Sequence, residues 1–194
     1  ISLGLVGSEM CIRDRAIIPF LDDLDESAQT INAVNCIHHR KGYNTDWIGF
    51  TQAMKINNIN LKDKHCSILG AGGAARAVAY SLIEAGVKSI FIQNRTQNNA
   101  DKLLKWIDSI FPDNSSHETA DVIINCTPLG MWPDTESMPN IKIYPGQVLV
   151  DTIYNPLETR WLNTEKSIDA KTIGGLDMFI AQGLASADLS LIHI

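Results

Sequence analysis

The feature that most constrains this chain is a glycine-rich turn between a buried strand and a helix. An apolar run at 65–69 is followed by GAGGAA at 70–75, and a helical pattern continues to Ala85. In that context the first glycine permits a tight turn, the second admits a pyrophosphate, and the helix N-terminus faces the phosphates. The alternative is a strand-to-helix turn that holds no ligand. We expect a dinucleotide site formed by Gly70, Ala71, Gly72, Gly73 and Ala74.

The end of the next strand indicates which dinucleotide. Enzymes that use NAD place an Asp or Glu there to bind the ribose 2′-hydroxyl. In this chain the strand at 89–93 is followed by Asn94, Arg95 and Thr96, with no acid. An arginine can pair with a 2′-phosphate, and the neighbouring polar side chains can add hydrogen bonds. This pattern favours NADP over NAD, the alternative for Arg95 being a solvated surface charge.

Apolar periodicity predicts an α/β protein with a Rossmann-type, doubly wound parallel sheet. Strands are expected at 65–69, 89–93, 121–126, 147–153 and 171–173, and helices at 98–111, 157–166 and from 176 onward. Ahead of the glycine turn, the pattern predicts a helix within 16–30, a strand at 31–37, a polar turn at 38–42 and a helix at 47–57.

Two further positions have the residue types of a site. Thr127 follows a strand, at the edge where open α/β sheets build their sites, and could face the nicotinamide; the alternative is a simple Pro-Gly turn. Asp46 precedes a helix, where it could be an N-cap. It could equally be a carboxylate that binds a substrate hydroxyl or transfers a proton, and the residues alone leave these alternatives even.

Composition excludes several classes of function. The 194 residues carry a net charge of −6, which argues against nucleic-acid or anionic-membrane partners. No apolar run approaches the ~20 residues of a membrane span. No metal site is expected, because His38 and His39 are adjacent in a loop. The four widely spaced cysteines predict buried free thiols and a reducing cytoplasm; they are Cys11, Cys36, Cys66 and Cys126.

Seven motifs in a fixed order make the chain resemble shikimate dehydrogenase from Ala16 to about Asp188. They are AVN at 33–35, GYNTD at 42–46, GAGGAARA at 70–77, NRT at 94–96, NCTPLGM at 125–131, DTIYNP at 151–156 and GGLDMFIAQ at 174–182. The resemblance implies reversible, NADPH-dependent reduction of 3-dehydroshikimate to shikimate, on the route to chorismate and the aromatic amino acids. It also implies a small-molecule substrate.

The resemblance also implies a role for each matching position. Asp46 matches the catalytic aspartate. The substrate-binding positions are Asn35, Asp46, Tyr154 and Gln182. The cofactor-binding positions are Gly70 to Ala74, the loop residues Asn94, Arg95, Thr96 and Asn99, the nicotinamide-side residues Thr127, Thr152 and Gly175, and, more weakly, Glu26.

The chain departs from the family in its N-terminal part. The family's substrate domain carries paired serines and a segment like Asn-Val-Thr-x-Pro-x-Lys, and neither is present. Counting back from Asn35 puts the catalytic lysine at Asp14, where the flanking arginines Arg13 and Arg15 hardly release a proton. Asn99 also stands near a position that is often basic in the family. We therefore expect little activity from this chain.

These observations divide the chain into four parts. Residues 1–15 are expected to be a non-native terminus, and residues 16–46 the remnant of an N-terminal α/β substrate domain. Residues 47–175 form the NADP-binding domain. Residues 176–194 form a helix that returns to the substrate domain, with its last residues also suspect.

Three functions stay open. The first is an incomplete shikimate dehydrogenase, and the second a quinate-using or NAD-tolerant relative. The third is a non-catalytic NADP-binding protein, which would have no use for the substrate positions Asn35, Asp46, Tyr154 and Gln182. The upstream DNA would separate truncation from a naturally short protein. The sequence does not show the oligomeric state, and a homodimer is one of the states it leaves open.

Overall fold

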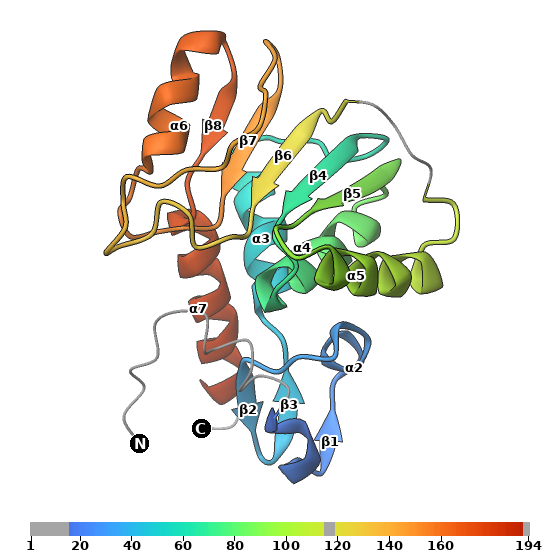
Figure 1. Ribbon diagram of the computed structural model, residues 1–194. Helices are drawn as coiled ribbons and strands as arrows, with labels where there is room; N and C mark the ends of the chain where they lie inside the picture. The colour runs from blue at the N-terminus through green and yellow to red at the C-terminus, as the bar shows by residue number, and fades with distance from the viewer. Residues whose placement is uncertain (1–15, 115–118, 192–194) are drawn as a thin grey trace.

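The computed structural model describes residues 16–114 and 119–191, which form two sheets connected by two long helices (Figure 1). The expected non-native terminus at 1–15, with Asp14, lies outside the described residues, as do residues 192–194. No helix within the described ranges is long and apolar enough to cross a membrane.

The larger sheet has five parallel strands in the order β5-β4-β6-β7-β8. Their bounds are β4 His65–Leu69, β5 Ser89–Gln93, β6 Val122–Asn125, β7 Val148–Asp151 and β8 Lys171–Ile173. The expected Rossmann-type sheet is therefore confirmed. Strands β6 and β7 are shorter than expected, because the chain turns into loops at Cys126 and Thr152.

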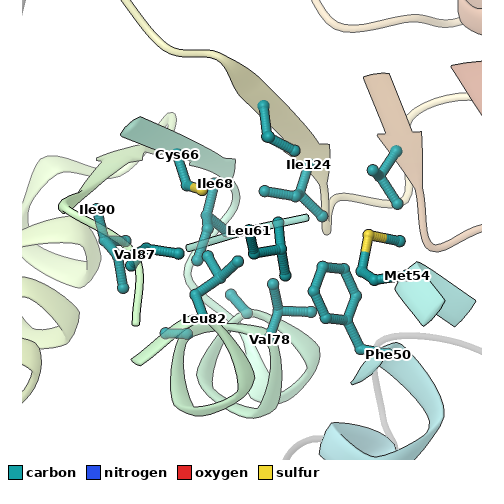
Figure 2. Packing of buried hydrophobic residues seen from close by; sticks show 14 of the residues in the cluster. Phe50, Met54, Leu61, Cys66, Ile68, Val78, Leu82, Val87, Ile90 and Ile124 are labelled. Atoms are coloured by element: carbon teal, nitrogen blue, oxygen red, sulfur yellow. The ribbon is translucent and has the colours of Figure 1, made fainter. Parts of the chain in front are cut away.

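Helices cover both faces of this sheet. Their bounds are α3 Asp46–Ile56, α4 Gly73–Glu84, α5 Gln97–Ile110, α6 Arg160–Glu165 with the 3-10 turn η2 Lys166–Ile168, and α7 Leu176–Leu191. On one face, Phe50 of α3 and Leu82 of α4 pack with Ile68 of β4, and all three side chains are fully buried (Figure 2). Burial of each such side chain stabilises the fold by about 1.5–3 kcal/mol.

A smaller core lies on the other face of the sheet. Alternate residues of a strand point to opposite faces, so Leu69 and Ile123 point away from the first core. They pack there with Leu149 of β7 and with Trp161 of α6, which is completely buried. The expectation of a doubly wound sheet is thus met by α6 on one side and by α3, α4 and α5 on the other.

The small sheet is formed by residues of the segment 16–46, which was expected to be the remnant of a substrate domain. It has the order β1-β3-β2, with β1 parallel and β2 antiparallel to β3. The bounds are η1 Ile18–Phe20, β1 Asp23–Leu24, α2 Glu26–Ile31, β2 Cys36–His38 and β3 Lys41–Tyr43. The division of the chain at 46 and 175 stays a prediction.

The sequence-based boundaries were wrong in this region. Asp25 caps α2 by accepting hydrogen bonds from the backbone N–H groups of Ser27 and Ala28 at 3.2 and 2.9 Å. The helix includes the buried Ile31, the first residue of the expected strand, and ends at its left-handed C-cap Asn32. The strand begins only at Cys36, and the polar turn at 38–42 is a tight hairpin whose centre is His39 and Arg40, both with positive φ.

The predicted cysteine chemistry holds in part. Cys36 and Cys66 are unbridged thiols, but only Cys66 is buried, while Cys36 is half-buried on the small sheet. Burial raises the pKa of the Cys66 thiol to about 12, so it stays protonated at neutral pH. Cys11 lies outside the described residues.

Helices α3 and α7 join the two sheets as an antiparallel pair (Figure 1). Thr45, ahead of α3, contacts Ser186 near the end of α7, whereas Asn57, after α3, donates a hydrogen bond to Asp177 in the first turn of α7. Between these two contacts the helices touch at Gly49, where an added Cβ would lie 2.6 Å from the Met178 carbonyl oxygen. The close approach of the two helices therefore requires glycine at this position.

We predict that Gly49→Ala lowers the free energy of unfolding by about 1–3 kcal/mol, because the methyl group would push the helices apart. This loss should exceed the gain in helix propensity that alanine normally brings. Urea denaturation followed by circular dichroism measures the change.

Gly183→Ala is the matched control, because Gly183 is also helical but an added Cβ would have nothing within 4 Å. It should stabilise the chain by about 0.5–1 kcal/mol. Equal stability changes in the two variants would contradict the assigned crossing point.

Candidate functional site

The glycine turn has the backbone geometry that a phosphate site needs. Gly70 has φ +107°, and an added Cβ there would lie 2.9 Å from the carbonyl oxygen of Cys126. Both the left-handed backbone and the close contact therefore require glycine. Helix α4 begins at Gly73, and its N-cap Gly72 provides no side chain to cap the first N–H groups. A bound phosphate can take that place.

The loop that was predicted to bind the 2′-phosphate lies directly beside this turn. Leu69 and Gln93 are paired in the sheet, and the Gly70 N–H donates to the Gln93 carbonyl at 2.7 Å. The next residue, Asn94, holds the loop by donating from Nδ2 to the Thr96 carbonyl at 2.8 Å. Arg95 is exposed, so its guanidinium is accessible to a ligand. Thr96 and Asn99 are exposed at the start of α5.

The three predicted nicotinamide-side residues lie together at the carboxyl ends of β6, β7 and β8. Thr127 donates from Oγ1 to Asn125 Oδ1 at 2.6 Å, and Thr152 donates from Oγ1 to the Asn125 carbonyl at 2.9 Å. The Gly175 N–H donates to the Ile153 carbonyl at 3.0 Å, and a Cβ at Gly175 would lie 2.6 Å from that oxygen. Gly175 therefore allows the loops after β7 and β8 to touch.

A buried carboxylate supports this edge, and sequence reasoning did not include it. Asp151 accepts hydrogen bonds from Asn125 Nδ2 at 3.2 Å, from the Ile153 N–H at 3.0 Å and from Thr159 Oγ1 at 2.8 Å. Asp151 and Asn125 are both fully buried. Burial raises the pKa of Asp151 to about 6, and the three hydrogen bonds lower it by a smaller amount.

The candidate catalytic aspartate lies at the other end of the molecule's central helix pair. Asp46 is the first residue of α3 and Thr45 is its N-cap, so the N-cap interpretation of Asp46 was wrong. Its Oδ1 accepts a hydrogen bond from Asn35 Nδ2 at 2.8 Å, and its N–H donates to Asn44 Oδ1 at 3.1 Å. Burial raises the pKa of the Asp46 carboxyl, while the Asn35 hydrogen bond lowers it.

Helix α7 carries the predicted substrate residue Gln182 and contacts Tyr154. The Gln182 Cβ would be 2.9 Å from a Cβ at Gly49, one turn after Asp46 on α3. Tyr154 stacks on Phe179 of α7 with ring centroids 4.1 Å apart. Asn35 and Asp46 thus lie near Ser186 of α7, to which Thr45 bonds. Gln182 is part of α7, and Tyr154 packs on Phe179 of the same helix.

Glu26 is less closely connected to these residues. It is the first residue of α2 and is exposed. Its charge is one of the smaller causes that raise the pKa of Tyr80 on α4, after burial and the charge of Glu84. Its role as a weak cofactor contact stays a prediction.

Two contributors near Asp46 were not identified from the sequence. Thr45 is completely buried and bonds both to Asn35 and, at 2.9 Å, to Ser186 Oγ on α7. A serine in a helix 141 positions away gives no local sequence signal. By contrast, Asn125 and Asp151 lay within the strands predicted at 121–126 and 147–153 and end the observed strands β6 and β7. Polar residues near the carboxyl ends of predicted buried strands could have indicated the supporting network.

Comparison with known proteins shows the family to which the chain belongs. Residues 51–129 match the family model described as shikimate / quinate 5-dehydrogenase. A shikimate dehydrogenase (NADP(+)) of Methanosphaera stadtmanae is 39% identical over 207 aligned positions, which cover 97% of this chain and 73% of that protein. The chain belongs to the shikimate dehydrogenase family.

Solved structures of the family have the same fold. A shikimate dehydrogenase in complex with NADP+ superposes with a TM-score of 0.84 at 38% identity, covering 92% of this chain and 68% of that one. The Thermus thermophilus enzyme with NADP(H) and shikimate gives 0.81 at 32% identity, covering 93% and 70%. A 5-ketofructose reductase of Gluconobacter gives 0.83 at 33% identity, covering 93% and 71%.

The buried carboxylate gives a prediction about stability and pH. Asp151 has a raised pKa in the folded chain, so the folded state holds its proton to higher pH than the unfolded state does. The protonated Asp151 carboxyl therefore stabilises the folded chain near pH 4, and this stabilisation is lost as the pH rises through about 6. Asp151→Asn keeps the acceptor for Ile153 and removes this titration.

Relative to Asp151→Asn, the unaltered chain should lose on the order of 2 kcal/mol of unfolding free energy between about pH 4 and pH 7. Urea unfolding at several pH values measures the difference. Asp134→Asn, which alters an exposed loop carboxylate, should leave the pH dependence unchanged. A constant difference between the unaltered chain and Asp151→Asn would contradict the prediction.

Proposed function

We propose that this chain binds NADP and acts as an oxidoreductase on shikimate, reversibly reducing 3-dehydroshikimate to shikimate with NADPH. The observation that carries the proposal is that α7 connects two sets of residues. Its start follows Gly175 at the nicotinamide-side edge. Its later turns reach the start of α3 beside Asp46, where Gln182 lies against Gly49 and Ser186 bonds to Thr45. The NADP(+) enzymes among its relatives support the same function.

The residues present fit a dinucleotide with a 2′-phosphate. The turn at 70–74 and the start of α4, where the N-cap Gly72 has no side chain, would hold the pyrophosphate. Arg95, with Asn94 and Thr96, would hold the 2′-phosphate, with Asn99 beside them. Thr127, Thr152 and Gly175 would lie along the nicotinamide. When bound, the cofactor supplies the hydride, and the protein supplies position and a proton.

The substrate side has residues suited to a small polyol acid. Asn35, Gln182 and Tyr154 carry amide and phenol groups that hydrogen-bond hydroxyls. Asn35 donates to Oδ1 of Asp46, and Oδ2 is the oxygen that would accept a hydrogen bond from a substrate hydroxyl. We infer that Asp46 accepts that hydroxyl and takes part in the proton transfer, since burial raises its pKa toward the range of a useful acid or base.

Binding tests this proposal more directly than rate does. Turnover should be low, because matching to the family puts Asp14 at the place of its catalytic lysine. Calorimetry should show that the NADP-saturated chain binds shikimate more tightly than quinate. Tighter binding of quinate would favour the quinate-using alternative, and no binding of either would favour a non-catalytic NADP-binding protein. A homodimer stays a prediction, which sedimentation analysis would test.

Arg95→Gln tests the choice of cofactor. Hydrogen bonds to charged groups contribute about 1.5–3 kcal/mol, so NADP affinity should fall by roughly 10- to 100-fold. Affinity for NAD should stay within about threefold, because NAD lacks the phosphate. Fluorescence titration with NADPH and NADH measures both affinities.

Arg160→Gln is the matched control, because Arg160 is an exposed arginine that pairs with Glu136 beyond β8. It should leave both affinities unchanged. If the unaltered chain binds NAD and NADP equally, the proposed cofactor is wrong.

A further inference from the structure

We propose that Ser186 is a positioning residue that holds Asp46 in place through Thr45 and Asn35. The inference relies on the proposed function only in treating Asp46 as the proton-transfer group. It rests on a chain of hydrogen bonds that leads from α7 to the start of α3 and to the loop before β2.

The chain of bonds begins on α7. The Ser186 hydroxyl donates to the carbonyl of Gln182 in the preceding turn at 2.9 Å. A serine hydroxyl has only one hydrogen, so a Ser186 that donates to Gln182 meets Thr45 as an acceptor, and we assign this direction to a pair in which either oxygen could donate. The two hydroxyl oxygens are 2.9 Å apart. Thr45 is therefore the donor in this pair.

The direction of that bond sets the next one. Once Thr45 has donated to Ser186, its oxygen faces Asn35 with lone pairs only, and it accepts from Asn35 Nδ2 at 3.1 Å. The second hydrogen of Nδ2 goes to Asp46 Oδ1 at 2.8 Å. The amide oxygen of Asn35 accepts the Thr45 N–H at 2.8 Å. Each of these donors therefore has an acceptor, and the bonds from Asn35 to Thr45, from Thr45 to Ser186 and from Ser186 to Gln182 share one direction.

Without Ser186 the direction is no longer determined. Thr45 could then turn its hydrogen toward Asn35 Oδ1, which lies 3.3 Å away. The Asn35 amide would then be held less firmly with Nδ2 toward Thr45 and Asp46. If the amide rotated by 180°, its oxygen would face the Asp46 carboxylate and repel it. Thr45 is completely buried, so water cannot readily replace the missing acceptor.

The structure therefore predicts that Ser186→Ala changes the titration of Asp46, although the two residues do not touch in any contact described here. The Asn35 hydrogen bond lowers the pKa of Asp46. Weakening that bond should move the titration midpoint of Asp46 to higher pH. A purely structural role for Ser186 would lower stability without moving the midpoint.

The experiment is a pH titration of the carboxylate carbon of Asp46 by NMR, on the whole chain without ligands. Ser186→Ala should raise the midpoint above that of the unaltered chain. Ser186→Thr should restore it, because threonine can also bond the carbonyl one turn back in a helix. Titratable groups on the surrounding elements stay the same in every variant, among them His38, Lys41, Lys55, Asp177 and Asp188.

Ser109→Ala is the matched control, because Ser109 likewise donates to a carbonyl of its own helix, that of Trp106. It should leave the midpoint of Asp46 unchanged. An unchanged midpoint in Ser186→Ala, or an equal shift in Ser109→Ala, would overturn the proposal. Because no ligand is added, the result does not depend on whether the chain binds NADP or shikimate.

Discussion

The antiparallel contact between α3 and α7 is the interaction on which the rest of the structure depends. These helices connect the parallel sheet to the small sheet, and they can approach closely only because Gly49 has no side chain. Asp46 begins one helix, and Gln182 and Ser186 lie on the other. The spacing of the pair therefore sets the geometry of every candidate substrate residue except Tyr154, which α7 reaches through Phe179.

Two polar networks then complete the site from opposite ends of this pair. Asp151 and Asn125 brace the loops after β6 and β7, and Thr45 and Asn35 hold Asp46. Buried polar groups are costly unless they are hydrogen-bonded. The burial of Asp151 is incompletely compensated, which is why its pKa rises. The Asp151 hydrogen bonds brace the loops at the cofactor edge, and the buried carboxylate lowers the free energy of unfolding above about pH 6.

Local sequence patterns predicted the parts of the fold that depend on local physics. The strands β4 and β5 and the glycine turn were correctly located, because strand burial and a φ of +107° impose specific residue types. The start of the chain was harder, since α2 includes Ile31, its left-handed C-cap Asn32 ends it there, and the strand predicted at 31–37 begins only at Cys36. Motif matching proposed Asn35, Asp46 and Gln182 as substrate residues, whereas the Thr45–Ser186 contact joins distant segments and has no local pattern.

By joining the two sheets, the helix pair would bring the cofactor edge and the substrate residues into one site. The most direct test is an NMR titration of shikimate into the NADP-saturated chain, observing the side-chain amides of Asn35 and Gln182. The account predicts that both signals move with a common affinity, and that this affinity differs when NADP is absent, because the two ligands would share one site. Shikimate that leaves both amides unmoved, or binds equally with and without NADP, would contradict it.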